Sequence, residues 1–344
     1  MSLPPSEIPQ GAIRFNTDSQ KLEFYAQGEW WVMSTDNNNL GDTPDVTPGT
    51  RAVFAGKETP GNTFTNDIEF INIAAGGTSQ DFGNLSGIRR FVGTCASSTR
   101  AVFFGGTNPA SSPGLQSTIE YVTIASTGDV TNFGSLNATT RQVGGAGNET
   151  RGLMFGGRTP GYISTIEYVT IATTGSQQDY GNLSESKENC GGCSSPTRAL
   201  SWGGGNPSGS VNTIEMMTIA TLGAVSDFGD LSRAAQSQSA ACSNATRGLF
   251  AGAGPTVANI EYVQIASTGN TSNFGDLTAA RGQTAAAASP TRGIWAGGYE
   301  SPSYVTTIDY VNFSTLGNAG EFGGMQGPTG SVGRTGCSNG HGGL

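Results

Sequence analysis

The sequence has very little histidine and little charge. His341 is the only histidine among 344 residues, so neither a Ser-His-Asp relay nor a histidine-rich metal cluster has support. Charged residues make up 12% of the chain and the net charge is -9, which argues against binding to nucleic acid or anionic membranes, because both need clustered cations. No apolar run is long enough for membrane insertion, and MSLPPSEIPQGAIRF lacks the basic and apolar regions of a secretory signal.

Glycine and alternating apolar segments are abundant instead. The 53 glycines indicate either disorder or many tight turns, and the alternation favours turns between strands. One strand-and-turn motif recurs along the chain: TIEYVTIASTG begins at Thr118, and close variants begin at Asp67, Thr165, Thr213, Asn259 and Thr307. Repetition of one pattern predicts a repeat protein in which each unit is a small group of strands.

The dipeptide Thr-Arg gives the period of the repeat. Successive copies are 49, 51, 47, 49 and 45 residues apart, and their arginines are Arg51, Arg100, Arg151, Arg198, Arg247 and Arg292. Each unit reads as four strands: a small-residue strand (a), a strand that follows Thr-Arg and ends in a small-Gly pair (b), the TIEYVTIA strand (c), and a strand that ends in aromatic-Gly (d). The small residues of strand a favour the innermost position, where neighbouring units crowd together.

This order of motifs resembles the kelch repeat over roughly residues 50–344, with Phe82 or Tyr180, for example, where kelch units usually carry Trp on strand d. The resemblance implies an all-β fold, a six-bladed kelch-like β-propeller of four-stranded antiparallel blades. CSNGHGGL, from Cys337, matches CSNATRGL, from Cys242. We therefore expect residues of about 327–340 to supply strand a of the first blade and to close the ring.

Several recurring residues resemble chemical sites and are interpreted as scaffold. The position four residues before Thr-Arg holds either cysteine or alanine in five of the units. The residues at this position are Cys95, Ala146, Cys193, Cys242 and Ala287, with Cys337 at the matching place near the end of the chain. Exchange between Cys and Ala indicates selection for small size, so Cys190-x-x-Cys193 is interpreted as packing and not as a redox or zinc pair. Neither a metal nor another cofactor is expected.

An acidic residue recurs on strand c, one strand away from the Thr-Arg arginine. These residues are Glu69, Glu120, Glu167, Glu215, Glu261 and Asp309. Because both charges return in every unit, we expect a structural ion pair across strands b and c within each blade.

We expect no enzymatic activity. DFG at 227–229 is one instance of the aromatic-Gly strand end, and the copper site of kelch-containing oxidases lacks its histidines here. A glycosidase needs two carboxylates, which Glu58, Glu185, Glu188 or Glu300 could supply, but their spacing selects no pair. A glycan-cleaving spike is kept as an alternative function.

Residues 1–36 form a separate, β-rich segment, followed by a polar linker at 37–49. Its three short strands cannot hold a core alone, and its apolar side chains need cover: Phe15, Phe24, Trp30 and Trp31. Neighbouring Trp30 and Trp31 must point to opposite faces of their strand. GAIRFNTDSQKLEFYAQGEWWVM resembles segments of bacteriophage tail-fibre and other virion structural proteins, and its combination with kelch-like arrays resembles structural proteins of marine phages.

The two resemblances together imply a virion structural protein, assembled in the host cytoplasm, that acts as a tail fibre, a knob or a decoration of capsid or tail. We expect the first segment to bind other virion proteins and to support an oligomer on the particle. The propeller would display a surface for a host-surface glycan or protein. An intracellular kelch-type protein scaffold is the remaining alternative.

Recognition is predicted on the face formed by the b–c and d–a loops, because the units differ most there. The candidate contact residues are Lys57, Arg158, Tyr162, Tyr299 and Tyr304. Further cations recur near the start of strand a and either contact the ligand or brace the ring; they are Arg89, Arg90, Arg141, Lys187, Arg233 and Arg281. So many cations on one face predict an anionic glycan or an acidic protein patch as the partner.

Overall fold

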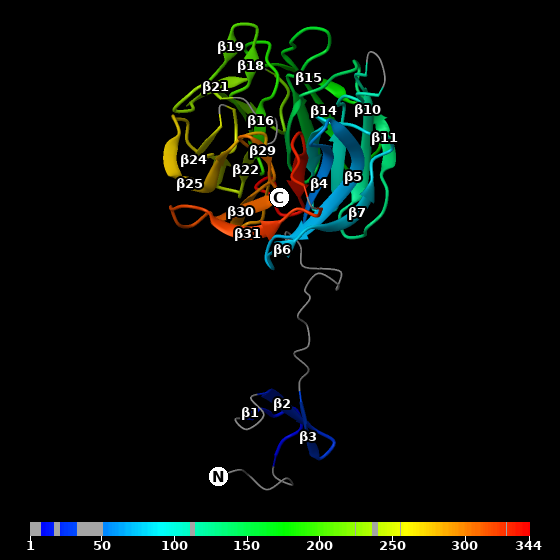
Figure 1. Ribbon diagram of the computed structural model, residues 1–344, viewed down its shortest axis with the longest axis vertical. Helices are drawn as coiled ribbons and strands as arrows, with labels where there is room; N and C mark the ends of the chain where they lie inside the picture. The colour runs from blue at the N-terminus through cyan, green and yellow to red at the C-terminus, as the bar shows by residue number, and fades with distance from the viewer. Residues whose placement is uncertain are drawn as a thin grey trace. The chain divides into compact units, whose positions relative to one another are not determined.

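The computed structural model describes residues 8–16, 21–32, 51–110, 114–223, 225–235, 240–254, 256–327 and 329–344. The chain divides into two compact units, Met1–Thr43 and Pro44–Leu344 (Figure 1). The linker predicted at 37–49 lies outside the described residues. The regular elements of the described residues are β-strands, so the predicted all-β class is confirmed.

The smaller unit is a three-stranded antiparallel sheet of β1 (Ile13–Asn16), β2 (Lys21–Ala26) and β3 (Glu29–Val32). Phe24 of β2 pairs with Ile13 on one side and with Trp31 on the other, so these three side chains lie in a row on one face. Trp30 pairs with Tyr25 on the opposite face. The prediction that Trp30 and Trp31 point to opposite faces is confirmed.

The larger unit repeats one sheet with strand order a-b-c-d. In five sheets the four strands a to d follow one another along the chain; they are numbered second to sixth, since the first sheet is the one that contains β4 (Arg51–Thr59). The second sheet contains β8 (Gly93–Ala96), β9 (Arg100–Phe104), β10 (Thr118–Thr123) and β11 (Thr131–Ser135), and the third contains β12 (Gly144–Gly147), β13 (Arg151–Phe155), β14 (Thr165–Thr170) and β15 (Gln178–Asn182). The fourth contains β16 (Gly191–Ser194), β17 (Arg198–Trp202), β20 (Thr213–Thr218) and β21 (Ser226–Asp230), the fifth contains β22 (Ala241–Ser243), β23 (Arg247–Phe250), β24 (Val257–Gln264) and β25 (Ser272–Arg281), and the sixth and last contains β26 (Ala285–Ala288), β27 (Arg292–Ala296), β30 (Thr307–Asn312) and β31 (Gly320–Gly324). The repeated four-stranded antiparallel sheets predicted from the sequence are confirmed. Two b–c loops carry small hairpins, β18 (Gly205–Asn206) with β19 (Gly209–Ser210) and β28 (Tyr299–Glu300) with β29 (Ser303–Tyr304).

The remaining sheet joins the two ends of the larger unit. Its strand a is the C-terminal β32 (Thr335–Ser338), which pairs antiparallel with β4 (Arg51–Thr59), followed by β5 (Thr63–Asn72) and β7 (Gln80–Asn84). The side chain of Asn339 also accepts a hydrogen bond from the backbone N–H of Arg51 (2.9 Å). The prediction that the C-terminal stretch completes the first sheet is therefore confirmed.

Contacts between the a strands run in a cycle: β8, β12, β16, β22, β26 and β32 each contact the next, and β32 contacts β8. At the outer edge, β6 (Gly77–Thr78), which lies between β5 and β7 in the chain, pairs in parallel with β31 as a fifth strand of the last sheet. Figure 1 also shows the C-terminus in the middle of this unit. The side chain of His341 lies there beside a central cavity of about 50 Å³ lined by the a strands.

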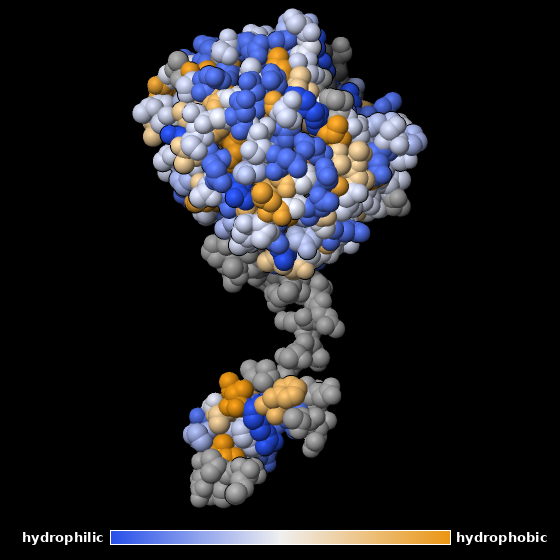
Figure 2. All heavy atoms as spheres, turned by 90° about the vertical axis from the view of Figure 1, so that its left-hand side faces the viewer, coloured by the Kyte–Doolittle hydropathy of each residue, from blue (hydrophilic) through white to orange (hydrophobic). Residues whose placement is uncertain are grey.

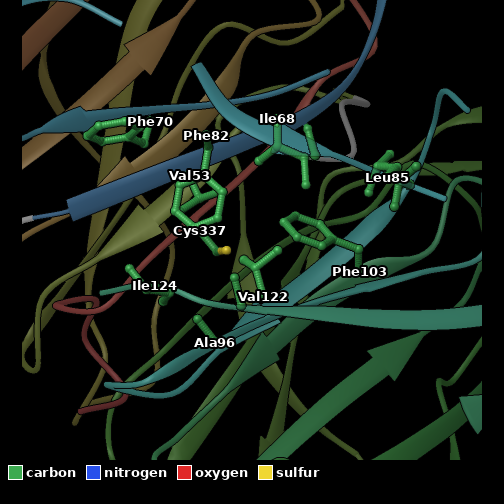
Figure 3. Packing of buried hydrophobic residues seen from close by; sticks show 13 residues of the cluster. Val53, Ile68, Phe70, Phe82, Leu85, Ala96, Phe103, Val122, Ile124 and Cys337 are labelled. Carbon is green, nitrogen blue, oxygen red and sulfur yellow. The ribbon is translucent and has the colours of Figure 1, made fainter. Parts of the chain in front are cut away.

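The hydrophobic core is divided into layers between neighbouring sheets. Figure 3 shows the layer between the first and second sheets, in which Val53 and Cys337 face Phe103 and Val122. The side chains of these residues are almost fully buried. Each layer needs small residues near the axis because neighbouring strands converge there.

Cysteine and glycine fit together in these layers. A Cβ added to Gly152 would overlap the sulfur of Cys95 from the preceding sheet, and a Cβ on Gly248 or Gly293 would lie 3.0 Å from the sulfur of Cys193 or Cys242. The cysteines are unpaired by disulfides and buried, and burial raises the pKa of Cys193 to about 12. Their interpretation as packing residues is supported by this fit.

The aromatic-Gly motif of strand d has a similar cause. A Cβ on Gly83 would overlap the carbonyl of Gly128 in the next sheet, whose N–H donates to the carbonyl of Phe82 (2.7 Å). Gly83 has a φ of 147°, which also favours glycine. The same overlap would arise between Gly323 of β31 and Gly77 of β6. Glycine is required here because two backbones approach closely.

The fit between Cys95 and Gly152 can be tested by a double-mutant cycle. Gly152→Ala should lower the free energy of unfolding by about 1 to 3 kcal/mol, because the added methyl group overpacks the layer. Cys95→Ala in the same chain should restore much of this loss, which chemical denaturation would measure. Gly161→Ala is the control, since a Cβ there meets nothing within 4 Å. Additive effects of the two substitutions would contradict the proposed fit.

Candidate ligand-binding surface

The predicted ion pair between strands b and c is wrong. In the third sheet Arg151 pairs with Thr170, whereas Glu167 pairs with Met154. Residues directly opposite each other share a face and successive residues alternate, so Arg151 and Glu167 point to opposite faces. The same offset separates Arg51, Arg100, Arg198, Arg247 and Arg292 from Glu69, Glu120, Glu215, Glu261 and Asp309.

The arginines connect neighbouring sheets instead. Arg151 stacks on the ring of Tyr168 in its own sheet, 4.3 Å from the centroid, and donates to the carbonyl of Ile219 in the next sheet (2.7 Å). The other arginines make equivalent bonds to the carbonyls of Ile124, Ile171, Ile265, Phe313 and Ile73. The bond from Arg292 to Ile73 links the last sheet to the first.

Four of the six acidic residues of strand c pair with a cation that stands shortly before strand a. Lys187 lies 2.6 Å from Glu215, Arg281 lies 2.6 Å from Asp309, and Arg89 pairs with Glu120. In the first sheet Glu69 pairs with Arg334 (2.8 Å). These side chains are buried, so the cations brace the sheets. The alternative that Arg89, Lys187 and Arg281 contact a ligand is not favoured.

Glu167 differs from these four carboxylates, because no ion pair is formed with it among the described residues. In three of the units the residue six positions before the Cys/Ala position of strand a is a cation: Arg89, Lys187 or Arg281. In the unit of Glu167 the residue at this position is Thr140, which carries no charge. Glu167 accepts a hydrogen bond from Asn137 (3.2 Å), and burial raises its pKa. For Glu215, burial also opposes ionisation, but the charge and hydrogen bond of Lys187 outweigh it and lower the pKa.

The d–a loops are tied together at their tips. Phe91, Gln142, Asn189 and Gln283 adopt left-handed φ angles between 55° and 58°, each two residues before strand a. The N–H of Gln142 donates to Phe91 (3.1 Å), and the N–H of Asn189 donates to Gln142 (3.0 Å). Backbone hydrogen bonds thus hold neighbouring loops in fixed positions around the axis.

Three of the cations on the b–c and d–a loop face are neutralised by neighbours. Lys57 lies 2.7 Å from Asp67 and 3.0 Å from Glu69. Arg158 lies 3.6 Å from Glu188 and 4.8 Å from the ring centroid of Tyr162. Arg90 pairs with Glu58. The prediction of an anionic ligand is based on the number of cations on this face. At these three positions the positive charge is paired with a carboxylate and is not free for a ligand.

Tyr299 and Tyr304 share an open groove of about 720 Å³. They face each other across the β28–β29 hairpin with ring centroids 5.9 Å apart, in an edge-to-face arrangement. The other lining residues are Pro60, Gly61, Pro302, Ser303, Val305, Thr306, Thr329 and Gly330. The sequence pattern indicated the two tyrosines but not these neighbours, which come from three separate segments of the chain.

Three of the four carboxylates considered for glycan cleavage have other partners. Glu58 pairs with Arg90, Glu188 pairs with Arg158, and Glu185 accepts a hydrogen bond from Asn206 (2.8 Å). In the described part of the chain, no group of three or more His, Cys, Asp or Glu side chains is placed to hold a metal ion. Within the same residues, no helix is long and apolar enough to cross a membrane.

His341 forms part of the packing near the axis. Its Nδ1 accepts a hydrogen bond from the N–H of Gly343 (3.1 Å), which leaves Nε2 to donate to the carbonyl of Ala96 (2.9 Å). Burial lowers the pKa of the ring. The neutral imidazole therefore ties the C-terminal residues to the second sheet.

No protein-family model matches this chain, and a search of curated proteins finds no similar sequence.

The role of the d–a cations can be tested with matched methionine variants. Lys187→Met should cost about 3 to 5 kcal/mol of unfolding free energy, because Glu215 stays buried without its partner. Lys187→Met with Glu215→Gln should recover part of this loss. Arg151→Met should cost less, roughly 1 to 3 kcal/mol, since it removes a stacked, half-buried cation and one hydrogen bond. Equal losses at Arg151 and Lys187 in urea titrations would contradict this assignment.

Equivalent carboxylates should respond oppositely to pH. The folded-state pKa of Glu215 is lowered, so its contribution to stability is present above about pH 4.5 and is lost as pH falls through the folded pKa. The pKa of Glu167 is raised, so the folded state gains stability as that carboxyl binds its proton. At pH 7 Glu215→Gln should destabilise the protein, whereas Glu167→Gln should leave it as stable or more stable. The free energy of unfolding of both variants would be measured between pH 3 and pH 7. If Glu167→Gln lowered it at pH 7 as Glu215→Gln does, the assignment would be incorrect.

Proposed function

We propose that the larger unit is a six-bladed, kelch-like β-propeller that acts as a binding module without enzymatic activity. The cyclic contacts of the a strands, the pairing of β32 with β4, and the bond from Arg292 to Ile73 support this architecture. A closed ring of sheets leaves its loops as the parts free to vary.

The smaller unit supplies the observation that carries the functional proposal. One face of its sheet exposes Ile13 (64%), Phe15 (58%), Phe24 (37%) and Trp31 (50%). Figure 2 shows orange, hydrophobic groups on the surface of this unit. Scattered apolar residues are ordinary, but a row of large side chains across three strands indicates a contact surface.

The opposite face of the same sheet is closed by its own side chains. Arg14 lies over the ring of Trp30, 4.1 Å from the centroid, and pairs with Glu23 (2.8 Å). Tyr25 packs against Trp30 with ring centroids 5.3 Å apart and is 3% exposed. Among the described residues of this unit, the face with Phe24 and Trp31 is the one left for a partner. Trp30, expected to be an anchor, supports the sheet from the other side.

These features favour a virion structural protein in which the smaller unit attaches to other virion proteins and the propeller is displayed. Such a protein would be a tail fibre, a knob or a decoration of capsid or tail, assembled in the host cytoplasm as an oligomer on the particle. Its displayed surface would bind a glycan or protein of the host surface. The division of the chain into an apolar attachment face and a loop-bearing ring supports this assignment.

Attachment can be tested in purified particles by mass spectrometry. Phe24→Thr combined with Trp31→Thr should reduce incorporation by at least about tenfold, because it removes the central side chains of the apolar face. The control is Leu222→Thr with Leu316→Thr, which changes two residues of the larger unit that are each 57% exposed. Both double variants should keep the thermal unfolding transition of the larger unit. Absence of the unaltered protein from particles, or normal incorporation of the Phe24 and Trp31 variant, would overturn the proposal.

A further inference from the structure

The groove at Tyr299 and Tyr304 lies where the last and first sheets meet. The β28–β29 hairpin follows β27, Pro60 and Gly61 belong to the b–c connection between β4 and β5, and Thr329 and Gly330 precede β32. A Cβ on Gly330 would overlap the backbone of Tyr304 and Val305. This close contact fixes the hairpin against the segment before β32, so the groove is already formed without a ligand.

The lining of the groove is polar but uncharged. Two tyrosine rings and the rings of Pro60 and Pro302 supply flat apolar surfaces, while Ser303, Thr306 and Thr329 supply hydroxyl groups. No charged side chain is among the described residues that line it. A site of this composition suits a ligand with apolar C–H faces and many hydroxyl groups.

The two charged side chains that act on Tyr304, Glu58 and Arg90, pair with each other. Glu58 is 6% exposed and is paired with Arg90. The pKa of Tyr304 is raised by burial and by the charge of Glu58, so its phenol is neutral and free to donate a hydrogen bond at pH 7. Among the described residues that line this groove, there is neither an unpaired cation for an anionic ligand nor an unpaired carboxylate for a cationic one.

The volume also matches a small-molecule site. Ligand pockets commonly measure about 300 to 1,000 Å³, and this groove measures about 720 Å³. It is open, so a chain of sugar rings could extend beyond the two tyrosines. Tyr162, in the b–c loop of the third sheet, offers a contrast because Arg158 lies over its ring.

We propose that this groove binds a neutral oligosaccharide, with a sugar ring stacked on Tyr304 and Tyr299 and its hydroxyl groups bonded to Ser303, Thr306 and Thr329. The proposal deepens the proposed function by naming the ligand class of the displayed surface, and it rests on that function for its biological role. It replaces the anionic glycan expected from the cation count, since six of those eight cations pair with carboxylates of the protein: Lys57, Arg89, Arg90, Arg158, Lys187 and Arg281.

The test uses the purified full-length chain on an array of neutral, sialylated and sulfated oligosaccharides and bacterial polysaccharides. We expect binding to neutral glycans. Calorimetric titration with the strongest neutral binder should give an affinity that changes little between 50 mM and 500 mM salt, because no charge pair forms. Binding to acidic glycans alone, binding to no glycan, or a steep loss with salt would overturn the proposal.

Point variants locate the site. Tyr304→Ala and Tyr299→Ala should each weaken binding at least about tenfold, as expected for aromatic anchors. Tyr304→Phe should stay within about threefold, since the ring is kept; it also serves if the alanine variants prove unstable by thermal unfolding. Tyr162→Ala is the matched control and should bind normally. A folded Tyr304→Phe that loses as much as Tyr304→Ala, or an equal loss in Tyr162→Ala, would contradict the assignment.

This experiment is independent of particle assembly. A chain that binds neutral glycans but is absent from particles would retain the groove and overturn the virion role. A chain that is incorporated into particles but binds no glycan would support the virion role and overturn the proposed glycan site.

Discussion

Close packing between successive sheets is the constraint on which the larger unit depends. Each sheet must bury both faces, and the layers are thin enough that single atoms matter, as at Cys95 against Gly152 and at Gly83 against Gly128. Interiors packed this densely leave little room for an added methyl group. The repetition of small residues follows from this geometry, and so does the need for a strand that closes the cycle, which β32 provides.

Polar groups are arranged by the same constraint. The strand-b arginines bridge to carbonyls of the next sheet, and the d–a cations neutralise buried carboxylates within a sheet. Buried charges are tolerated only when they are paired, so these side chains are committed to the scaffold. Residues outside the repeat do not take part in these ion pairs and hydrogen bonds between the sheets. Tyr299 and Tyr304 are therefore the better candidates for recognition.

The two units expose different surfaces. On the smaller unit, Phe24 and Trp31 form an apolar row that suits a protein partner, while Arg14 and Trp30 close the other face. On the larger unit, the seam between last and first sheets forms a groove with hydroxyl groups and aromatic rings. One surface favours burial against protein, and the other favours a hydrated, neutral ligand.

The sequence alone determined the repeat, its strand order and the role of the C-terminal strand, because period, turn glycines and small residues are local properties of the chain. It also identified Tyr299 and Tyr304 as unrepeated loop residues. The partners of Arg151 and Glu167 were decided only by the tertiary structure: strand register sets which face each side chain occupies, and the period does not reveal register. The groove likewise needed the fold, because Pro60, Tyr304 and Thr329 are far apart in the chain and meet only where the first and last sheets join.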